Sequence, residues 1–220
     1  MDFARRGKKI IAIGQNYWDH IKELNAEVPE GVLFFLKPTT SYLKAPNTVL
    51  IPPGRNVHHE VELGLVIGKT GRDIKPEDAL DYVSGYALAL DITARDEQFA
   101  ASKKGLPWTV SKGYDHFTPI SEFIPKSKIA DPQNIQLWIK VNDTIRQNEN
   151  TDQMIFKIPT LISEVSKVMT LEENDLIITG TPKGVGPIFE GDKIVAGMSE
   201  NGRDITTISL DVKERPKARF

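Results

Sequence analysis

The stretch that decides the fold is His58-His59-Glu60-Val61-Glu62-Leu63-Gly64-Leu65-Val66-Ile67. Its β-branched and aliphatic residues, with a Pro-Pro-Gly turn before it and a glycine after it, predict a β-strand. Alternate side chains of a strand share a face, so every second residue of 61–67 points one way, and Glu60 and Glu62 point the other way. Adjacent carboxylates repel and raise each other's proton affinity, and a cation between them removes that conflict. A half-solvated strand with two exposed glutamates is the alternative, and this pair alone leaves both interpretations open.

The composition limits the class of protein. The chain has 220 residues, 28 Lys and Arg, 30 Asp and Glu, and a formal charge of −2. We expect a single domain over residues 1–220 with a sizeable core, and the lack of a basic excess argues against a nucleic-acid binder. The chain has no cysteine, which excludes disulfides, thiolate metal sites and cysteine nucleophiles.

No apolar run in the sequence reaches the length of a membrane span, so we expect a soluble protein. Residues 1–9 form a basic N-terminal extension without the hydrophobic region of a secretory signal. We therefore expect a mitochondrial or cytoplasmic protein that is not secreted.

Apolar periodicity predicts the secondary structure. Asn142-Asp143 and Asn201-Gly202 are typical of tight turns between strands, whereas residues 39–56 are predicted to be loop-rich because of their prolines and glycine. Strands outnumber helices and the helices are short, so the predicted class is α+β with a dominant β core. The predicted strands span residues 10–13, 32–36, 86–91, 136–141, 175–179, 191–195 and 205–212, and the predicted helices span residues 17–24, 93–104 and 158–169, with a short one from Pro76.

An acidic residue, Asp91, ends the apolar strand predicted over 86–91. One interpretation is that Asp91 caps the helix that follows, since Asp is favoured at the N-cap. Thr93 can serve as that cap instead, which leaves Asp91 free for other chemistry. Arg95 and Gln98 lie three residues apart and therefore share a face of this helix.

Three further polar features have both structural and functional interpretations. His20 and Glu23 lie three residues apart on one helix face, where an incidental surface pair is the simpler interpretation. Lys112, beside a glycine, is expected at a strand end and is by default a solvated lysine. The glycine-rich segment 180–186 can present backbone N–H groups to an anion, but it lacks the spacing of a nucleotide-binding P-loop.

A set of motifs occurs in a fixed order along the chain and resembles the fumarylacetoacetate hydrolase family. Segments 104–109 and 154–156 are similar to its short, single-domain branch, and the resemblance runs from about residue 10 to residue 197. The run 99–102 departs from that branch because it lacks an acidic pair. The motifs are Gly14-Gln15-Asn16-Tyr17, Phe35-Leu36-Lys37-Pro38, His59-Glu60-Val61-Glu62-Leu63, Leu90-Asp91-Ile92-Thr93-Ala94-Arg95-Asp96 and Thr179-Gly180-Thr181-Pro182-Lys183-Gly184-Val185-Gly186.

The resemblance implies a β-rich roll of mixed strands with short peripheral helices, usually as a homodimer. It also implies a metal site built from Glu60, Glu62 and Asp91. The chemistry agrees, because three carboxylates with open positions suit Mg²⁺, with Mn²⁺ as a possible substitute. Lys112 matches the family's lysine beside that site.

The resemblance assigns the remaining site residues. His20 and Glu23 match a His–Glu dyad on a mobile N-terminal helix, which outweighs the incidental interpretation given above. Arg95 and Gln98 match polar residues near the substrate, and Thr181 matches the residue that holds the substrate carboxylate.

The implied substrates are small 2-oxo acids, namely acylpyruvates and oxaloacetate. Hydrolysis, decarboxylation and enol–keto tautomerisation can share one scaffold, and the sequence does not rank them. The alternatives are a family relative that isomerises ring-cleavage dioates or dehydrates sugar acids, and a non-catalytic β-roll with a structural ion. The His20–Glu23 pair argues against the first alternative, and convergence of Lys112 and Thr181 on the metal positions would argue against the second.

Overall fold

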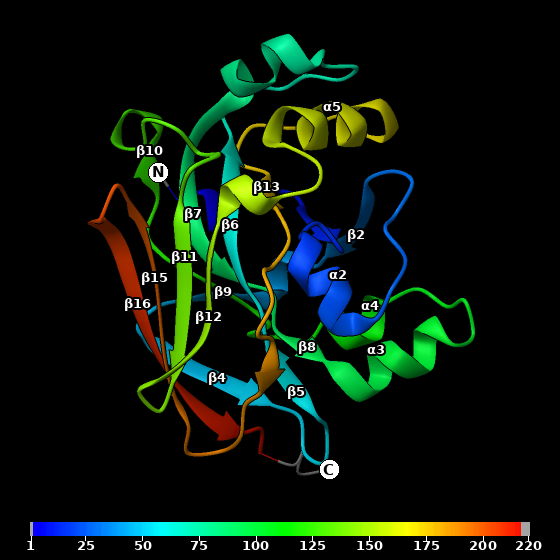
Figure 1. The fold of residues 1–220 in the computed structure, drawn as a ribbon, viewed down its shortest axis with the longest axis vertical. Coiled ribbons are helices and arrows are strands. Elements are labelled where there is room, and N and C mark those ends of the chain that lie inside the picture. Colours follow the sequence, from blue (N-terminus) through cyan, green and yellow to red (C-terminus); the bar gives the residue numbers. More distant parts are fainter. Residues whose placement is uncertain (1, 217–220) are drawn as a thin grey trace.

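A computed structural model describes residues 2–216, and its largest element is a curled sheet of mixed strands (Figure 1). The strand order is β2-β1-β13-β6-β7-β9-β3, and β10 pairs with β7. The central strand β6 lies between two antiparallel neighbours, while β1 and β13 run parallel. The strands are β1 (Ile10–Gly14), β2 (Leu33–Lys37), β3 (Tyr42–Lys44), β6 (Val61–Ile67), β7 (Val83–Leu90), β9 (Thr118–Ile120), β10 (Ile124–Pro125) and β13 (Leu176–Ile178).

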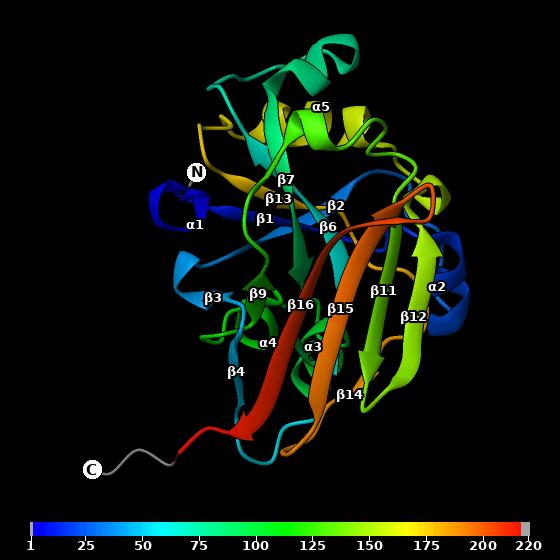
Figure 2. The same cartoon turned by 90° about the vertical axis from the view of Figure 1, so that its left-hand side faces the viewer.

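A second sheet packs against the first, with the order β12-β11-β15-β16-β4. Figure 2 shows these strands side by side in front of the larger sheet. Asn142 and Asp143 both have positive φ in the hairpin between β11 and β12, which confirms the predicted turn. The strands are β4 (Asn47–Ile51), β11 (Gln136–Val141), β12 (Thr144–Asn150), β15 (Lys193–Glu200) and β16 (Arg203–Glu214), and a small third sheet joins β14 (Gly186–Pro187), β5 (Val57–His59) and β8 (Thr93–Ala94).

The main core lies between the two larger sheets. Leu63 and Leu65 of β6 belong to the same buried cluster as Ile139 of β11 and Met198 of β15. The other face of β6 is also covered, because Val66 belongs to a second buried cluster. Since every residue of β6 is buried, the half-solvated interpretation of this strand is wrong.

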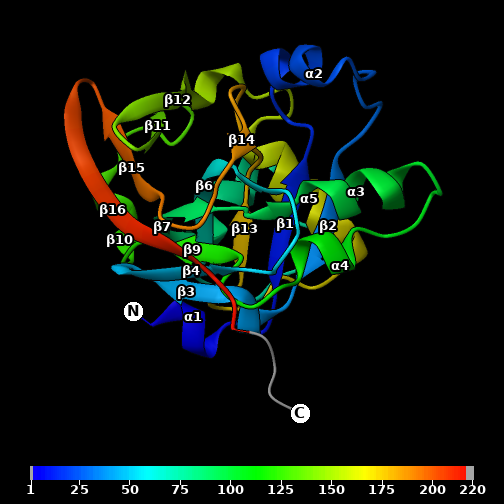
Figure 3. The same cartoon turned by 90° about the horizontal axis from the view of Figure 1, so that it is seen from below.

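The helices are short and peripheral, as predicted, so the α+β class with a β-rich roll is confirmed. Seen from below, α2, α3 and α4 lie on the side away from β15 and β16 (Figure 3). In the part of the chain that the structure describes, no helix is long and apolar enough to cross a membrane. The helices are α1 (Phe3–Arg6), α2 (Trp18–Leu24), α3 (Arg95–Ser102), α4 (Thr109–Lys112) and α5 (Ile158–Val168), with 3₁₀ turns η1 (Thr39–Ser41), η2 (Pro76–Tyr82), η3 (Lys126–Lys128) and η4 (Thr151–Gln153).

The structure corrects four local predictions. The strand predicted through residue 60 breaks there, between β5 and β6. The loop-rich segment 39–56 contains β3 and β4, which pair in parallel with the distant strands β9 and β16. The helix predicted from Thr93 begins at Arg95, because residues 93–94 pair with β5 as β8. Lys112 lies at the end of the short helix α4, not at a strand end.

The glycine-rich segment between β13 and β14 rests directly on β12. Gly184 has φ +90°, and a Cβ there would lie 1.9 Å from the carbonyl oxygen of Arg146. Gly191 also has φ +90°, but a Cβ there would meet no atom within 4 Å. The two glycines therefore share one backbone conformation and differ in steric surroundings.

This difference gives a matched test of the packing. We expect Gly191→Ala to lower the free energy of unfolding by about 1–2 kcal/mol, the cost of a left-handed alanine. Gly184→Ala pays that cost and also overlaps the β12 backbone, so we expect a further loss of about 3 kcal/mol. Urea unfolding of both variants measures the difference, and equal losses would show that the segment does not rest on β12.

Candidate active site

Pairing between β6 and β7 brings the three predicted metal ligands together. Val61 lies opposite Leu90 in the antiparallel register, so Glu60 and Asp91 both sit just beyond the paired ends of their strands. The Asp91 backbone N–H donates to the Glu60 carbonyl oxygen at 2.8 Å, which holds the break between β5 and β6. The carboxylates of Glu60, Glu62 and Asp91 each offer an oxygen, and these oxygens lie within 4.8 Å of one another.

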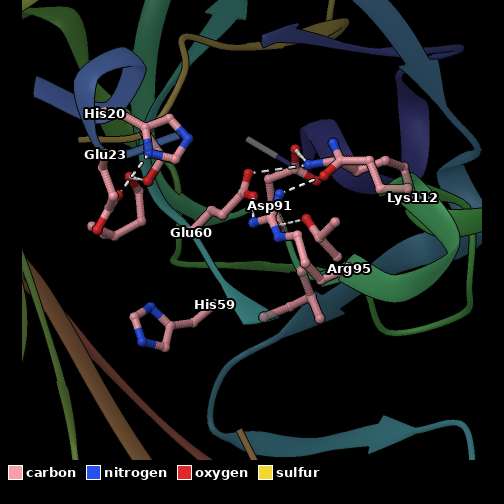
Figure 4. Close-up of polar contacts among 12 residues, drawn as sticks. His20, Glu23, His59, Glu60, Asp91, Arg95 and Lys112 are labelled. Carbon is pink, nitrogen blue, oxygen red and sulfur yellow. Dashed lines mark hydrogen bonds and ion pairs between the residues drawn. The ribbon is translucent and has the colours of Figure 1, made fainter. Parts of the chain in front are cut away.

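Three basic side chains surround this carboxylate triad. Lys112 Nζ lies 2.5 Å from an Asp91 oxygen and 3.1 Å from a Glu60 oxygen. Lys37 Nζ donates to the other Asp91 oxygen at 2.5 Å, and Arg95 forms an ion pair with Glu60. In Figure 4, Lys112 and Arg95 reach Glu60 and Asp91 from one side. All six side chains are buried. The charges of the three acids are therefore compensated by contacts with the three basic side chains and not by solvent.

The two glutamates experience opposite electrostatic surroundings. Burial alone raises the pKa of Glu60, but the charges of Lys112 and Arg95 outweigh it and hold the pKa well below its usual range. For Glu62, burial and the charges of Asp91 and Glu60 act together and raise the pKa well above its usual range. Burial lowers the pKa of Lys112, yet Asp91 and Glu60 overcome this and raise it. Glu62 is therefore the carboxylate whose charge is least compensated by the protein.

The triad fits a hard divalent cation. Glu62 accepts a hydrogen bond from the Gly180 backbone N–H at 2.7 Å. Within residues 2–216 it forms no salt bridge, whereas Glu60 has two basic partners. An ion among the three carboxylates would supply the positive charge that Glu62 lacks, and carboxylate oxygens are the ligands that Mg²⁺ and Mn²⁺ prefer.

The predicted His–Glu pair lies on the opposite side of the same cavity (Figure 4). His20 Nδ1 and Glu23 Oε2 are 3.0 Å apart, and His20 is 5 % exposed. The Glu23 carboxylate also accepts from the Gly184 backbone N–H at 3.0 Å and 3.2 Å. Glu23 therefore orients the imidazole and links α2 to the glycine-rich segment.

A cavity of about 90 Å³ is lined by all the predicted site residues except Glu23, which lies behind His20. Arg95 bridges Gln98 and Glu60 through hydrogen bonds from its two terminal nitrogens. Thr181 Oγ1 donates to the Val61 carbonyl oxygen at 2.9 Å. Apolar rings complete the wall, namely Phe35, Phe99 and Trp108.

Two buried polar residues at the site received no role from the sequence. Lys37 belongs to the motif Phe35-Leu36-Lys37-Pro38. A lysine at the end of an apolar strand could have indicated a buried, paired side chain. Burial lowers the pKa of Lys37, while its contact with Asp91 opposes this. Gln147 reaches Thr181 from the second sheet, and its strand gave no sign of a buried polar side chain, because its neighbours are mostly polar.

Comparison with known proteins identifies relatives over most of the chain. Residues 9–212 match the family described as fumarylacetoacetate (FAA) hydrolase C-terminal. The mitochondrial oxaloacetate decarboxylase of Dictyostelium discoideum is 56% identical over 199 residues, covering 90% of this chain and 91% of that protein. The human mitochondrial oxaloacetate tautomerase FAHD1 is 52% identical over 197 residues, covering 89% of each chain.

Solved structures share the same fold. The yeast fumarylacetoacetate hydrolase family protein ynq8 superposes with a TM-score of 0.89 at 36% identity, covering 99% of this chain and 98% of its own. Fumarylpyruvate hydrolase from Pseudomonas aeruginosa, in complex with Mn²⁺ and pyruvate, has a TM-score of 0.89 at 31% identity, covering 95% and 91%.

The unequal surroundings of the glutamates predict opposite effects of neutralising them in metal-free protein. A carboxyl with a raised folded pKa binds more protons in the folded state, so its contribution to stability falls as the pH rises above the usual carboxyl range. We therefore expect Glu62→Gln to stabilise the metal-free fold, by a margin that is wider at pH 8 than at pH 5. Urea unfolding in the presence of a chelator measures this margin.

Glu60→Gln is the matched control, because the same change removes the partner of buried Lys112 and Arg95. We expect it to cost about 3 kcal/mol. The pKa of Glu60 is lowered, so the stability that Glu60 contributes is present above the usual carboxyl range and is lost as the pH falls below it. Identical stability of wild type and Glu62→Gln at both pH values would contradict this description of the triad.

Proposed function

This chain belongs to the fumarylacetoacetate hydrolase family, and from this premise we propose that it is a metal-dependent enzyme acting on small 2-oxo acids. The substrate class comprises oxaloacetate and acylpyruvates. The observation that carries the proposal is the buried triad of Glu60, Glu62 and Asp91, which shares one cavity with His20. The printed activities of the relatives, oxaloacetate decarboxylase and oxaloacetate tautomerase, support the same class.

We assign Glu60, Glu62 and Asp91 as the residues that would hold the metal, with Mg²⁺ as the native ion and Mn²⁺ as a substitute. Such an ion supplies Lewis-acid polarisation of a 2-oxo acid when bound. Lys112 lies within contact of two of the carboxylates, so its charge also attracts an anionic substrate. Lys112 is thus assigned to stabilise negative charge that develops on the C2 oxygen during the reaction.

The substrate is held by the polar wall of the cavity. Thr181 is assigned to the substrate carboxylate, and Arg95 and Gln98 to the adjacent polar atoms. Arg95 already contacts both Gln98 and Glu60, so its guanidinium is pre-oriented. The aromatic rings in the same wall exclude water from the distal end of the substrate.

Hydrolysis of an acylpyruvate requires an activated water. His20 takes a proton from this water, and Glu23 stabilises the resulting imidazolium through Nδ1–H. The water oxygen adds to the distal carbonyl carbon, and the bond between that carbon and C3 breaks. The products are a carboxylic acid and the enolate of pyruvate, which takes up at C3 the proton held by His20.

The other two activities use the same groups. Decarboxylation of oxaloacetate breaks the C3–C4 bond: the C4 carboxylate leaves as carbon dioxide and the electron pair moves toward the C2 oxygen, which Lys112 is assigned to stabilise. The resulting enolate takes up a proton at C3. Tautomerisation moves one proton between C3 and the C2 oxygen. Neither reaction needs a water nucleophile, so the three activities differ mainly in their demand on His20.

We further propose a mitochondrial homodimer in which residues 1–220 form one catalytic domain. The mitochondrial designation of the Dictyostelium and human relatives supports the compartment. A structural relative from Mycobacterium marinum is a 2-hydroxyhepta-2,4-diene-1,7-dioate isomerase, so isomerisation of a dioate is the second candidate. A substrate panel of both oxaloacetate tautomers, acetylpyruvate and fumarylpyruvate, with and without Mg²⁺, distinguishes the candidates.

Metal removal tests the triad directly. Turnover should be abolished by a chelator and restored by Mg²⁺ or Mn²⁺. The reason is that the triad is assigned to hold the ion that polarises the 2-oxo acid. Glu62→Gln should weaken Mn²⁺ binding, measured by electron paramagnetic resonance of the free ion. Full activity after exhaustive metal removal would rule out the proposed role.

His20→Ala separates the activities. General-base removal typically costs roughly a hundred- to ten-thousand-fold, and we expect that loss for acylpyruvate hydrolysis. Oxaloacetate decarboxylation should fall much less in the same preparation, since it needs no activated water. Steady-state rates with the two substrates measure the difference.

Lys22→Ala is the control for this comparison, because Lys22 lies on the same helix with its side chain 74% exposed. We expect both activities to persist in it. If His20→Ala instead reduces hydrolysis and decarboxylation equally, His20 serves a shared proton transfer at C3 and the water-activation role is wrong.

A further inference from the structure

Gln147 is a buried amide in an otherwise polar and mostly exposed strand. Along β12 it alone is buried, and it is 1 % exposed. The pairing of β12 with β11 shifts register beside it, since Ile139 faces Gln147 while Lys140 faces Ile145. Such a bulge re-aims a side chain out of the regular alternation. The irregularity directs Gln147 away from solvent and toward the larger sheet.

The amide of Gln147 uses its full hydrogen-bonding capacity. Its Oε1 accepts from the Val61 backbone N–H at 3.0 Å and lies 3.0 Å from His59 Nδ1. Its Nε2 donates to Thr181 Oγ1 and to the Pro182 carbonyl oxygen, both at 2.8 Å. Because Oε1 must face the Val61 N–H and Nε2 must face the Pro182 carbonyl oxygen, only one orientation of the amide fits. His59 must then donate to Oε1 through Nδ1–H.

These contacts replace a strand partner for β6. The ladder between β13 and β6 ends at Ile178, which faces Gly64. Beyond it, Val61 has its N–H bound by Gln147 and its carbonyl bound by Thr181 Oγ1. On this edge of β6, the residue between the two glutamates is therefore held by side chains, while on the other edge it pairs with Leu90 of β7.

The same bonds determine what Thr181 presents to the cavity. Its hydroxyl accepts from Gln147 and donates to the Val61 carbonyl oxygen, so its only hydroxyl proton is committed to Val61. A carboxylate can only accept hydrogen bonds, so the donor that Thr181 offers it is the backbone N–H. Thr181 is 4 % exposed and lines the cavity beside the triad. The close approach of Gly184 to the backbone of Arg146 presses the same segment onto β12.

We propose that Gln147 is a positioning residue of the active site, which anchors Thr181 and Pro182 so that the Thr181 backbone N–H can bind the carboxylate of the 2-oxo acid. The inference rests on the role of Thr181 under the proposed function. His59 supports Gln147 from behind and lies apart from the ion-paired residues (Figure 4). Gln147 itself is not among the residues that line the cavity, so it acts on substrate through Thr181.

The test is a double-mutant cycle on Mn²⁺-loaded protein with oxalate as the probe. Gln147→Met keeps the length of the side chain and removes its hydrogen bonds. We expect it to weaken oxalate binding roughly tenfold, as expected for one lost hydrogen bond. Thr181→Val should cause a similar loss. The double variant should bind oxalate no more than about tenfold more weakly than wild type, because both changes remove the same contact. Titration calorimetry measures each dissociation constant.

Gln136→Met is the matched control, because Gln136 Nε2 also donates to a side chain, at 2.8 Å, but on the exposed face of β11. Its oxalate affinity should equal that of wild type.

Gln147→Glu is the second variant, should Gln147→Met fail to fold. It keeps the acceptor for Val61 and His59 and removes the donor to Thr181 and Pro182, so the same tenfold loss is expected.

The outcomes distinguish the positioning role of Gln147 from the assigned role of Thr181. Loss in Thr181→Val with affinity within twofold of wild type in the Gln147 variants would overturn the positioning role and leave the proposed function standing. Losses that multiply to about a hundredfold in the double variant would do the same. Unchanged oxalate affinity in Thr181→Val would overturn the assigned role of Thr181, and the inference with it.

Discussion

The desolvation of three adjacent carboxylates is the constraint on which this structure depends. Burying an ionised carboxylate costs several kcal/mol unless partners compensate for the lost water. Here the compensation comes from Lys37 on β2, Lys112 on α4 and Arg95 on α3. Lys37 and Lys112 lie 54 and 21 positions from Asp91 along the chain, so the fold has to bring these lysines to the acids before the acids can be buried.

This constraint explains the irregular backbone around the site. The strand predicted over residues 58–67 is interrupted at Glu60, between β5 and β6, at the point where Glu60, Glu62 and Asp91 converge. The break leaves backbone groups without a ladder partner, and an unpaired buried backbone group is costly. Gln147 accepts from the Val61 N–H and Thr181 donates to the Val61 carbonyl oxygen, which satisfies both backbone groups of this residue. Polar contacts at the site and the irregular geometry are therefore parts of one solution.

The two sides of the cavity are held by different forces. The triad and its cations are buried in the sheet, where any movement would expose an unpaired charge. Helix α2 is held above them by the Glu23 contact with Gly184 and by an exposed ion pair between Lys183 and Asp19. Exposed pairs of this kind stabilise little because water screens them. The arrangement combines a buried charged floor with a wall that carries His20 and is held both by these contacts and by buried Ile21.

Local pattern was sufficient for a large part of the fold and of the candidate site. The pairing of Glu60 with Glu62 and the position of Asp91 follow from strand periodicity, and the helix predicted over residues 17–24 is observed as Trp18–Leu24. Apolar residues recur along a helix or strand with the period of that element. A single segment of sequence is therefore enough to predict the type of the element and its buried face. The family resemblance, not spacing, connected these residues to His20, Lys112 and Thr181.

The tertiary structure decided what depends on distant segments. The parallel pairings of β3 with β9 and β4 with β16 lie in a stretch predicted to be loop-rich. The partnership of Lys37 with Asp91 and the contact of Gln147 with Thr181 join residues 54 and 34 positions apart. The sequence by itself determined which residues are apolar, acidic or amide, and hence which faces are buried. Which cation compensates which acid was decided only by chain topology, because a buried charge selects its partner by proximity in space and not along the chain.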